Sequence, residues 1–163
     1  MITTILSDFS FVILFPKNSS YAGKLNNLNF KLTNKHDNYD FFSYFELNQP
    51  LLDYYKSLKK DYSINIFTAG TIPNHPSLKK IINPIFDHIF TTKDYNISKT
   101  DPSSYKLIAE KLGKKTKEIL FIDDQKANLQ AASEVGIITI HYKDMSQLNE
   151  NIKNSSIMPS SFH

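Results

Sequence analysis

The segment Ile119–Ala132, with the sequence ILFIDDQKANLQAA, constrains the fold of this chain more than any other. Its first residues, Ile119–Ile122, are apolar and predict a short buried strand. A helical pattern begins almost at once, with the acid pair Asp123-Asp124 between strand and helix. A buried strand that leads directly into a helix is typical of the units that build parallel sheets, so this segment predicts an α/β fold.

The same alternation of strand and helix recurs along the chain. Further strands are predicted over Thr3–Ser7, Ile64–Phe67, Ile85–Phe90 and Ile137–Ile140, and Phe11–Phe15 is a second apolar run, ended by Pro16. Helices are predicted from Pro50 to Leu58, and over Pro76–Ile82, Pro102–Leu112, Leu129–Val135 and Met145–Ile152. Asn48 and Asp101 suit N-caps, and Gly113 and Gly136 suit helix ends. We therefore expect a three-layer, Rossmann-like fold in which a parallel sheet carries helices on both faces.

The stretch between the first strand and Asn48 predicts an insert, about residues 11–47. Residues 17–40 are rich in Asn, Lys and Ser and lack helical periodicity, and the best candidate for a hairpin there is Lys24–Leu32. Residues 41–47 are ambiguous between helix and loop. Seven aromatic residues crowd residues 21–45 of the insert and predict either a small core that packs a flap down, which we favour, or a binding platform. They are Tyr21, Phe30, Tyr39, Phe41, Phe42, Tyr44 and Phe45.

Length and composition narrow the class of protein. A chain of 163 residues favours a single domain, 1–163, and residues 153–163 resemble a flexible, Ser-rich tail. The absence of cysteine excludes disulfides, thiolate metal sites and a Cys nucleophile. A net charge of +3 with scattered lysines is no nucleic-acid signature. No apolar run approaches the ~20 residues that span a bilayer, and the N-terminus lacks the features of a signal peptide, so we expect a cytoplasmic protein without a membrane partner.

The acid pair Asp123-Asp124 predicts a metal site. Adjacent carboxylates repel each other, and keeping both ionised at a strand end is costly unless a cation lies between them. Oxygen ligands in this position suit Mg²⁺. The alternative interpretation is a surface turn in which Asp124 caps the following helix.

Polar residues end several of the predicted strands. Asp8 ends the first strand, Thr68 ends the strand after Asn48, and Lys99 stands just before the helix that begins at Asp101. In a parallel sheet the carboxyl ends of all strands share one edge, so these groups and the acid pair can converge there. A carboxylate, a hydroxyl, an ammonium and a metal site together suit phosphoryl transfer.

These segments resemble the motifs of the haloacid dehalogenase (HAD) superfamily, from residue 3 to about 141. ILSDFS resembles its nucleophile strand, INIFTAG the strand ending in Ser or Thr, and SKTDPSSYKLIAEKLG its Lys segment. ILFIDDQKANLQAASEVGIITI closely resembles its last motif. Receiver domains use similar residues, but their acid pair lies on the first strand, whereas here it comes last.

The resemblance implies a Mg²⁺ cofactor and four metal-binding positions. Asp8 is the implied nucleophile and also a ligand, and the backbone carbonyl of Ser10 is a second ligand. Asp123 and Asp124 complete the protein's share of the shell, with water and phosphate filling the rest.

The resemblance also implies which residues hold the substrate. Thr68, with the amides near Ala69 and Gly70, holds the transferring phosphoryl group, and Lys99 pairs with Asp8 and the phosphate. Lys93 is a weaker candidate for the lysine, because no Asp-Pro helix start comes after it.

Ser10 departs from the family pattern. At this position, phosphatases of the family usually carry an Asp that protonates the leaving group and then activates water. Such acid–base catalysis raises the rate by about 10²–10⁴-fold. A serine hydroxyl titrates too high for that role, and Phe11-Val12 replaces the usual Gly-Thr. We therefore expect a slow, Mg²⁺-dependent phosphohydrolase that forms an aspartyl-phosphate on Asp8. The alternative is a non-catalytic member that binds a phosphorylated ligand or acts as a scaffold.

The insert looks too short for a full helical cap. In this respect the chain resembles the capless or flap-only members of the family. Such an open site suits large phosphorylated substrates, or a site that closes by homo-oligomerisation. The substrate is therefore either a phosphorylated small molecule or a phosphorylated macromolecule. His75 lies after Gly70 and is a candidate for substrate contact, although a plain loop residue is the favoured interpretation.

Overall fold

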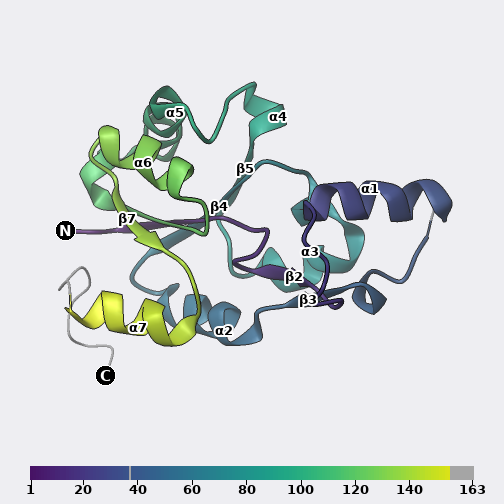
Figure 1. The fold of residues 1–163 in the computed structure, drawn as a ribbon. Helices are drawn as coiled ribbons and strands as arrows, with labels where there is room; N and C mark the ends of the chain where they lie inside the picture. The colour runs from purple at the N-terminus through teal and green to yellow at the C-terminus, as the bar shows by residue number, and fades with distance from the viewer. Residues whose placement is uncertain (37, 155–163) are drawn as a thin grey trace.

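The computed structural model describes residues 1–36 and 38–154. Within them, five strands form a parallel sheet in the order β5-β4-β1-β6-β7 (Figure 1). The strands are β1 (Thr4–Ser7), β4 (Ser63–Thr68), β5 (His88–Thr91), β6 (Ile119–Asp123) and β7 (Ile138–His141). This is the predicted α/β, Rossmann-like sheet, and β1 lies at its centre.

The register of the central strands brings the predicted site residues to one edge. Ser7, the last residue of β1, pairs with Ile66 of β4 and with Ile122 of β6. The next residue, Asp8, donates its amide hydrogen to the carbonyl of Ile122, over 2.8 Å. Asp8 therefore lies beside Asp123, and Thr68 ends β4 on the other side.

Helices cover both faces of the sheet, as expected. α2 (Gln49–Leu58), α3 (Pro76–Ile82) and α7 (Met145–Asn154) pack on one face through a core that includes Ile5 and Ile64. α5 (Pro102–Leu112) and α6 (Lys126–Glu134) pack on the other face, against Leu6 and Phe121 (Figure 1). None of the helices in the described ranges is long and apolar enough to cross a membrane.

The predicted helix ends have a clear physical basis. The Asn48 side chain accepts a hydrogen bond from the Leu51 amide at the start of α2, and Asp101 accepts one from Ser103 at the start of α5. Gly113 ends α5 in the left-handed conformation, with φ +63°, which a residue without a Cβ adopts at little cost. A short helix that the sequence patterns did not predict, α4 (Thr92–Tyr95), comes directly after β5.

The insert after β1 contains a hairpin, but not where it was predicted. β2 (Leu14–Pro16) pairs antiparallel with β3 (Phe45–Leu47), so residues 41–47 hold a 3₁₀ turn, Phe41–Ser43, and then a strand. The prediction of a hairpin over Lys24–Leu32 is wrong, because α1 (Leu25–Lys35) occupies that stretch. Leu25, Leu28 and Leu32 line one face of this helix at helical spacing, a pattern obscured by the Asn- and Lys-rich residues between them.

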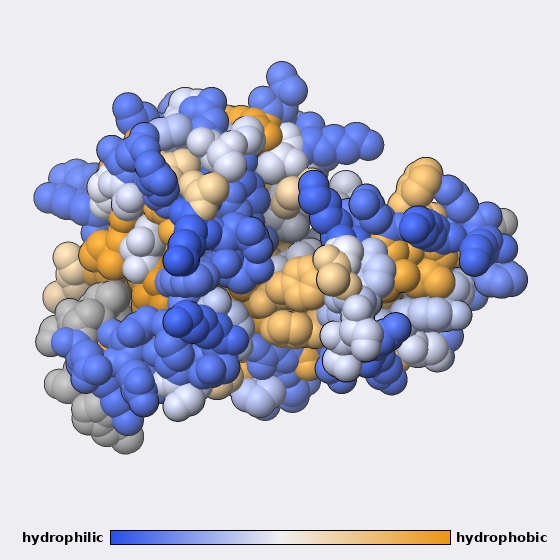
Figure 2. All heavy atoms as spheres, in the orientation of Figure 1, coloured by the Kyte–Doolittle hydropathy of each residue, from blue (hydrophilic) through white to orange (hydrophobic). Residues whose placement is uncertain are grey.

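The aromatic residues of the insert mainly serve packing. Phe41 and Phe45 are buried and stack with ring centroids 4.7 Å apart. Both belong to the core on the face of the sheet that α2, α3 and α7 cover. Phe30 and Tyr44 remain exposed, by 66% and 43%. Figure 2 shows hydrophobic side chains around the insert on a face that is otherwise mostly hydrophilic. Most of the predicted tail, residues 155–163, lies outside the described residues.

Candidate active site

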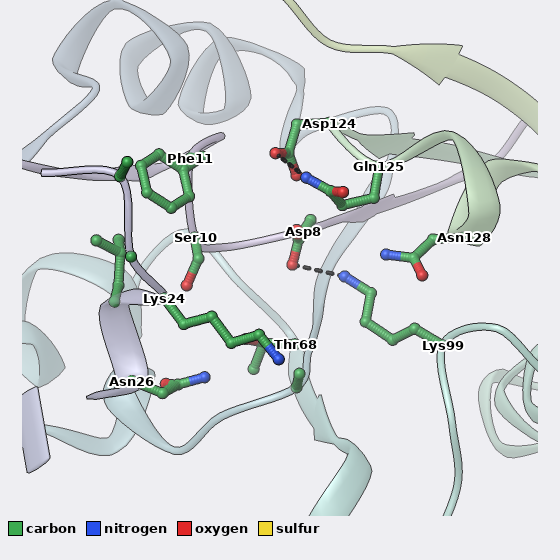
Figure 3. Close-up of a pocket in the computed structure, with 14 residues that line it drawn as sticks. Asp8, Ser10, Phe11, Lys24, Asn26, Thr68, Lys99, Asp124, Gln125 and Asn128 are labelled. Carbon is green, nitrogen blue, oxygen red and sulfur yellow. Dashed lines mark hydrogen bonds and ion pairs between the residues drawn. The ribbon is translucent and has the colours of Figure 1, made fainter. Parts of the chain in front are cut away.

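A pocket of about 420 Å³ opens at the carboxyl ends of β1, β4 and β6 (Figure 3). The central strand supplies Asp8, and the turn after it supplies Ser10 and Phe11. Its other lining residues come from the insert, from the end of β4 and from the segments before α5 and α6. They are Ala22, Gly23, Lys24, Leu25, Asn26, Thr68, Ala69, Lys99, Asp124, Gln125 and Asn128.

Lys99 joins the carboxylates of β1 and β6 in one buried ionic cluster. Its Nζ lies 2.6 Å from Oδ1 of Asp8 and 2.7 Å from Oδ2 of Asp123. The three side chains are exposed by only 8%, 9% and 0%, respectively. The backbone carbonyl of Lys99 accepts a hydrogen bond of 2.7 Å from the buried Tyr105 hydroxyl. Packing therefore holds the ammonium in place between the two acids.

Asp123 is fixed from the α6 side as well. Its Oδ1 accepts a 2.7 Å hydrogen bond from the Gln125 amide, and Nδ2 of Asn128 lies 3.2 and 3.1 Å from its two oxygens. Asp124 does not cap α6, since Gln125 occupies the N-cap position and the Asp124 carboxylate accepts a hydrogen bond from the Gln125 side chain. The surface-turn interpretation of the acid pair is therefore wrong for Asp124.

The acid cluster fits a cation with oxygen ligands. One carboxylate oxygen each of Asp8, Asp123 and Asp124 lies within 4.8 Å of the others. When ionised, the three acids carry three negative charges, and Lys99 returns one positive charge. Two uncompensated charges in a largely buried cluster are costly, and a divalent cation would balance them. Carboxylate oxygens with no sulfur or imidazole among them suit a hard cation.

Burial dominates the ionisation of Asp8. The pKa of Asp8 is raised to about 7: burial raises it most, Lys99 lowers it, and the neighbouring Asp123 adds a smaller increase. Burial works against the charge of Lys99 as well, but the two carboxylates outweigh it and raise its pKa above the ordinary value. Lys99 is therefore a permanent cation, and Asp8 needs further positive charge to stay ionised at neutral pH.

The end of β4 forms the opposite wall. Thr68 is buried, and its hydroxyl oxygen lies 3.4 Å from the Gly70 amide. Thr68 and Ala69 line the pocket, whereas Gly70 lines a neighbouring hollow. A Cβ on Gly70 would overlap the side chain of Asn26, so glycine allows the insert to lie directly against this loop.

A tight turn comes after Asp8 and presents Ser10 and Phe11 to the pocket (Figure 3). Phe11 has φ +60°, a conformation that is rare for a bulky residue. Its amide donates a hydrogen bond of 2.8 Å to the Leu14 carbonyl, and the Phe9 carbonyl accepts from Leu14 over 2.9 Å. The turn that glycine usually permits is thus formed here by phenylalanine.

Several pocket residues were missed from the sequence, among them the polar residues Lys24 and Asn26. Both lie in the stretch that was predicted to be a hairpin, and no local motif marks them. In Figure 3 they face Asp8 from the other side of the pocket. His75 does not line this pocket: its ring lies 4.5 Å from that of Phe41, and its Nδ1 accepts from the Ser77 amide. Lys93 is exposed and lines the neighbouring hollow.

A family model described as haloacid dehalogenase-like hydrolase matches residues 28–136. The chain is 43% identical over 58 residues to enolase-phosphatase E1 of Thioalkalivibrio sulfidiphilus (strain HL-EbGR7), which covers 36% of this chain and 25% of that protein. It is 34% identical over 105 residues to enolase-phosphatase E1 of Aquifex aeolicus (strain VF5). That match covers 58% of this chain and 46% of that protein. The chain thus spans less than half the length of these relatives.

Among solved structures, the fold resembles that of a HAD-family enzyme of Bacteroides thetaiotaomicron, which was crystallised in complex with magnesium and inorganic phosphate. The TM-score is 0.67 at 16% sequence identity, and the match covers 91% of this chain and 99% of that one. At this identity the likeness concerns the fold alone.

Proposed function

Because this chain belongs to the haloacid dehalogenase-like hydrolases, we propose that it is a Mg²⁺-dependent phosphohydrolase whose nucleophile is Asp8. The observation that carries the proposal is the convergence of Asp8, Thr68, Lys99 and Asp124 on one pocket, from segments far apart in the sequence. Asp123 is buried beside them and paired with Lys99. A structural ion pair alone would require neither the three clustered acids nor the open pocket beside them.

The metal ligands in this proposal are Asp8, the backbone carbonyl of Ser10, Asp123 and Asp124. The charge of the cluster and its oxygen-only ligands support a divalent cation. The magnesium in the Bacteroides enzyme agrees with this choice. Bound Mg²⁺ would neutralise negative charge on the phosphoryl group as it transfers.

The chain's own residues then divide the reaction into two displacements. An oxygen of Asp8 attacks phosphorus, the new O–P bond forms, and the bond to the leaving oxygen breaks with its electron pair on that oxygen. The Thr68 hydroxyl and the amides near Ala69 and Gly70 hold the phosphoryl oxygens, while Lys99 fixes Asp8. Water then attacks phosphorus, releases inorganic phosphate and restores the Asp8 carboxylate.

Ser10 makes the second displacement slow in this proposal. Ser10 lines the pocket where a carboxylate would deprotonate the attacking water, but a hydroxyl offers no such base near neutral pH. We therefore expect phosphorylation of Asp8 to precede a slower hydrolysis of the phosphoenzyme.

The test is hydrolysis of an aryl phosphate with and without Mg²⁺. Wild type should release phosphate slowly and only with Mg²⁺, and Asp8→Asn should release none. Asp53→Asn is the matched control, since Asp53 is 61% exposed and lies outside the pocket. Equal rates in wild type and Asp8→Asn would exclude this reaction at this site.

The second candidate is a non-catalytic phosphate-binding or scaffold protein, which the loss of the acid at Ser10 favours. Mass spectrometry of acid-quenched protein distinguishes the two. A phosphate adduct on Asp8 after exposure to an aryl phosphate supports the enzyme. Mg²⁺-dependent phosphate binding without an adduct supports the scaffold.

A further inference from the structure

Lys24 is a cation of the pocket that the ionic cluster does not use. Lys99 is the only lysine paired with Asp8 and Asp123 among the described residues, and Lys24 has no acidic partner within that part of the chain. With a divalent cation bound, the three acids and Lys99 would balance to zero. A phosphate ester would bring new negative charge into the pocket, and Lys24 is the pocket's remaining positive side chain.

The backbone around Lys24 is held in place rather than free. Its carbonyl accepts hydrogen bonds of 3.0 Å from the Tyr21 hydroxyl and from the Asn27 amide. Two residues later, Asn26 lies directly against Gly70, so the start of α1 is seated on the loop after β4. The insert therefore holds the base of the Lys24 side chain beside the pocket at two places.

The direction of attack by Asp8 determines which atom of the substrate lies near Lys24. Attack by Asp8 on phosphorus pushes the leaving oxygen away on the opposite side, because the two oxygens lie roughly in line. Figure 3 shows the Lys24 side chain extending from near Ser10 toward Thr68, across the pocket from Asp8 and Lys99. Lys24 thus lies on the leaving-group side, where Ser10 provides no acid.

We propose that Lys24 is a further catalytic residue, which acts on the leaving oxygen in place of the missing acid. As the bond from phosphorus to the leaving oxygen breaks, the electron pair moves onto that oxygen. The oxygen takes a proton from the Lys24 ammonium, and the resulting amine regains a proton from water. This inference rests on the proposed function, since it concerns the first displacement at Asp8.

The role predicts a substrate class. A lysine that assists departure lets the protein act on esters of ordinary alcohols and phenols, whose oxygens leave poorly without help. Without Lys24, only esters or anhydrides with an intrinsically good leaving group would transfer their phosphoryl group at a useful rate. In the second displacement water would attack phosphorus from the side that the leaving oxygen has vacated, which is the side of Lys24. An ammonium that has regained its proton is no base for that water, so we expect no help from Lys24 in the second displacement.

The experiment compares phenyl phosphate with 2,4-dinitrophenyl phosphate, whose leaving oxygen needs no proton. The quantity measured is kcat/KM, because it reports the steps up to departure of the phenol and is independent of the slower dephosphorylation. In Lys24→Met, kcat/KM for phenyl phosphate should fall by about 10²-fold, within the range for acid assistance. The loss for the dinitrophenyl ester should be at least tenfold smaller.

Lys31→Met is the matched control, since Lys31 is an exposed lysine of α1, the helix that begins directly after Lys24, and does not line the pocket. It should leave both values of kcat/KM unchanged. Lys24→Arg keeps the charge but cannot release a proton, so it should not restore kcat/KM for phenyl phosphate, and full recovery would overturn proton transfer from Lys24. An equal loss for both esters in Lys24→Met, or the same selective loss in Lys31→Met, overturns this role and leaves the proposed function standing. If neither ester is turned over in an Asp8-dependent way, both the role of Lys24 and the proposed function are refuted.

Discussion

Replacement of Lys99 by methionine tests the buried ionic cluster, since methionine keeps most of the side-chain volume and removes the charge. At 2.6–2.7 Å and an effective dielectric constant of about 20, each of its two ion pairs amounts to roughly 6 kcal/mol of Coulomb attraction. Desolvation of the three groups offsets much of this attraction. Removal of one partner from a buried pair costs about 3–5 kcal/mol, because it leaves charge without compensation.

We therefore expect Lys99→Met to lower the free energy of unfolding by about 3–5 kcal/mol in metal-free protein. For a domain of this size the melting temperature should drop by about 6–20 °C. Far-ultraviolet circular dichroism in urea suits the measurement, because the chain has no tryptophan to follow by fluorescence. The same variant should also lose phosphatase activity.

Lys93→Met and Lys99→Arg serve as controls for this prediction. Lys93 is exposed, so its replacement should change the free energy of unfolding by less than about 0.5 kcal/mol. Arginine keeps the charge and should recover part of the stability. A loss below about 1 kcal/mol in Lys99→Met, similar to that in Lys93→Met, would refute the inference that Lys99 neutralises a buried acid cluster.

Two further predictions concern Ser10 and Asp87. Ser10→Asp should raise the rate of dephosphorylation by about 10²-fold or more, as measured by single-turnover decay of the phosphoenzyme, and no gain in a folded variant would mean that the acid is not limiting. Burial works against ionisation of Asp87, but hydrogen bonds from Lys59, Ser63 and the Ile64 amide outweigh it and lower its pKa below 3.8. Asp87 therefore stabilises the fold above about pH 4, and this stabilisation is lost as pH falls through the lowered pKa. Asp87→Asn should cost about 1 kcal/mol in urea unfolding at neutral pH and less near pH 3, and a cost independent of pH would contradict this.

The sheet and the cluster at its edge were predictable because their signals are local and consistent. Each central strand is a short apolar run that stops at a polar residue, and the caps Asn48 and Asp101 mark the starts of α2 and α5. Parallel strands place their carboxyl ends on one edge, so order along the chain was enough to bring Asp8, Thr68 and Asp123 together.

The insert was not predictable by the same means. The apolar face of α1 has only three leucines among polar residues, and most of its stability comes from contacts that form after the chain has folded. Lys24 and Asn26 reach the pocket because α1 is seated on Gly70, a contact between segments more than forty residues apart. Propensity and periodicity describe neighbours in sequence and carry no information about such a contact.

The turn after Asp8 contains both departures from the family pattern, Ser10 and Phe11-Val12, and they have different consequences. Phe11 adopts the left-handed conformation in place of glycine, at a cost of roughly 1–3 kcal/mol. Its hydrogen bond to Leu14 and its edge-to-face contact with Phe15, with centroids 6.2 Å apart, offset a comparable amount. Phenylalanine therefore forms this turn at little net cost. The chemical change is confined to the side chain at Ser10, so Mg²⁺ binding should survive where acid–base catalysis is weakened.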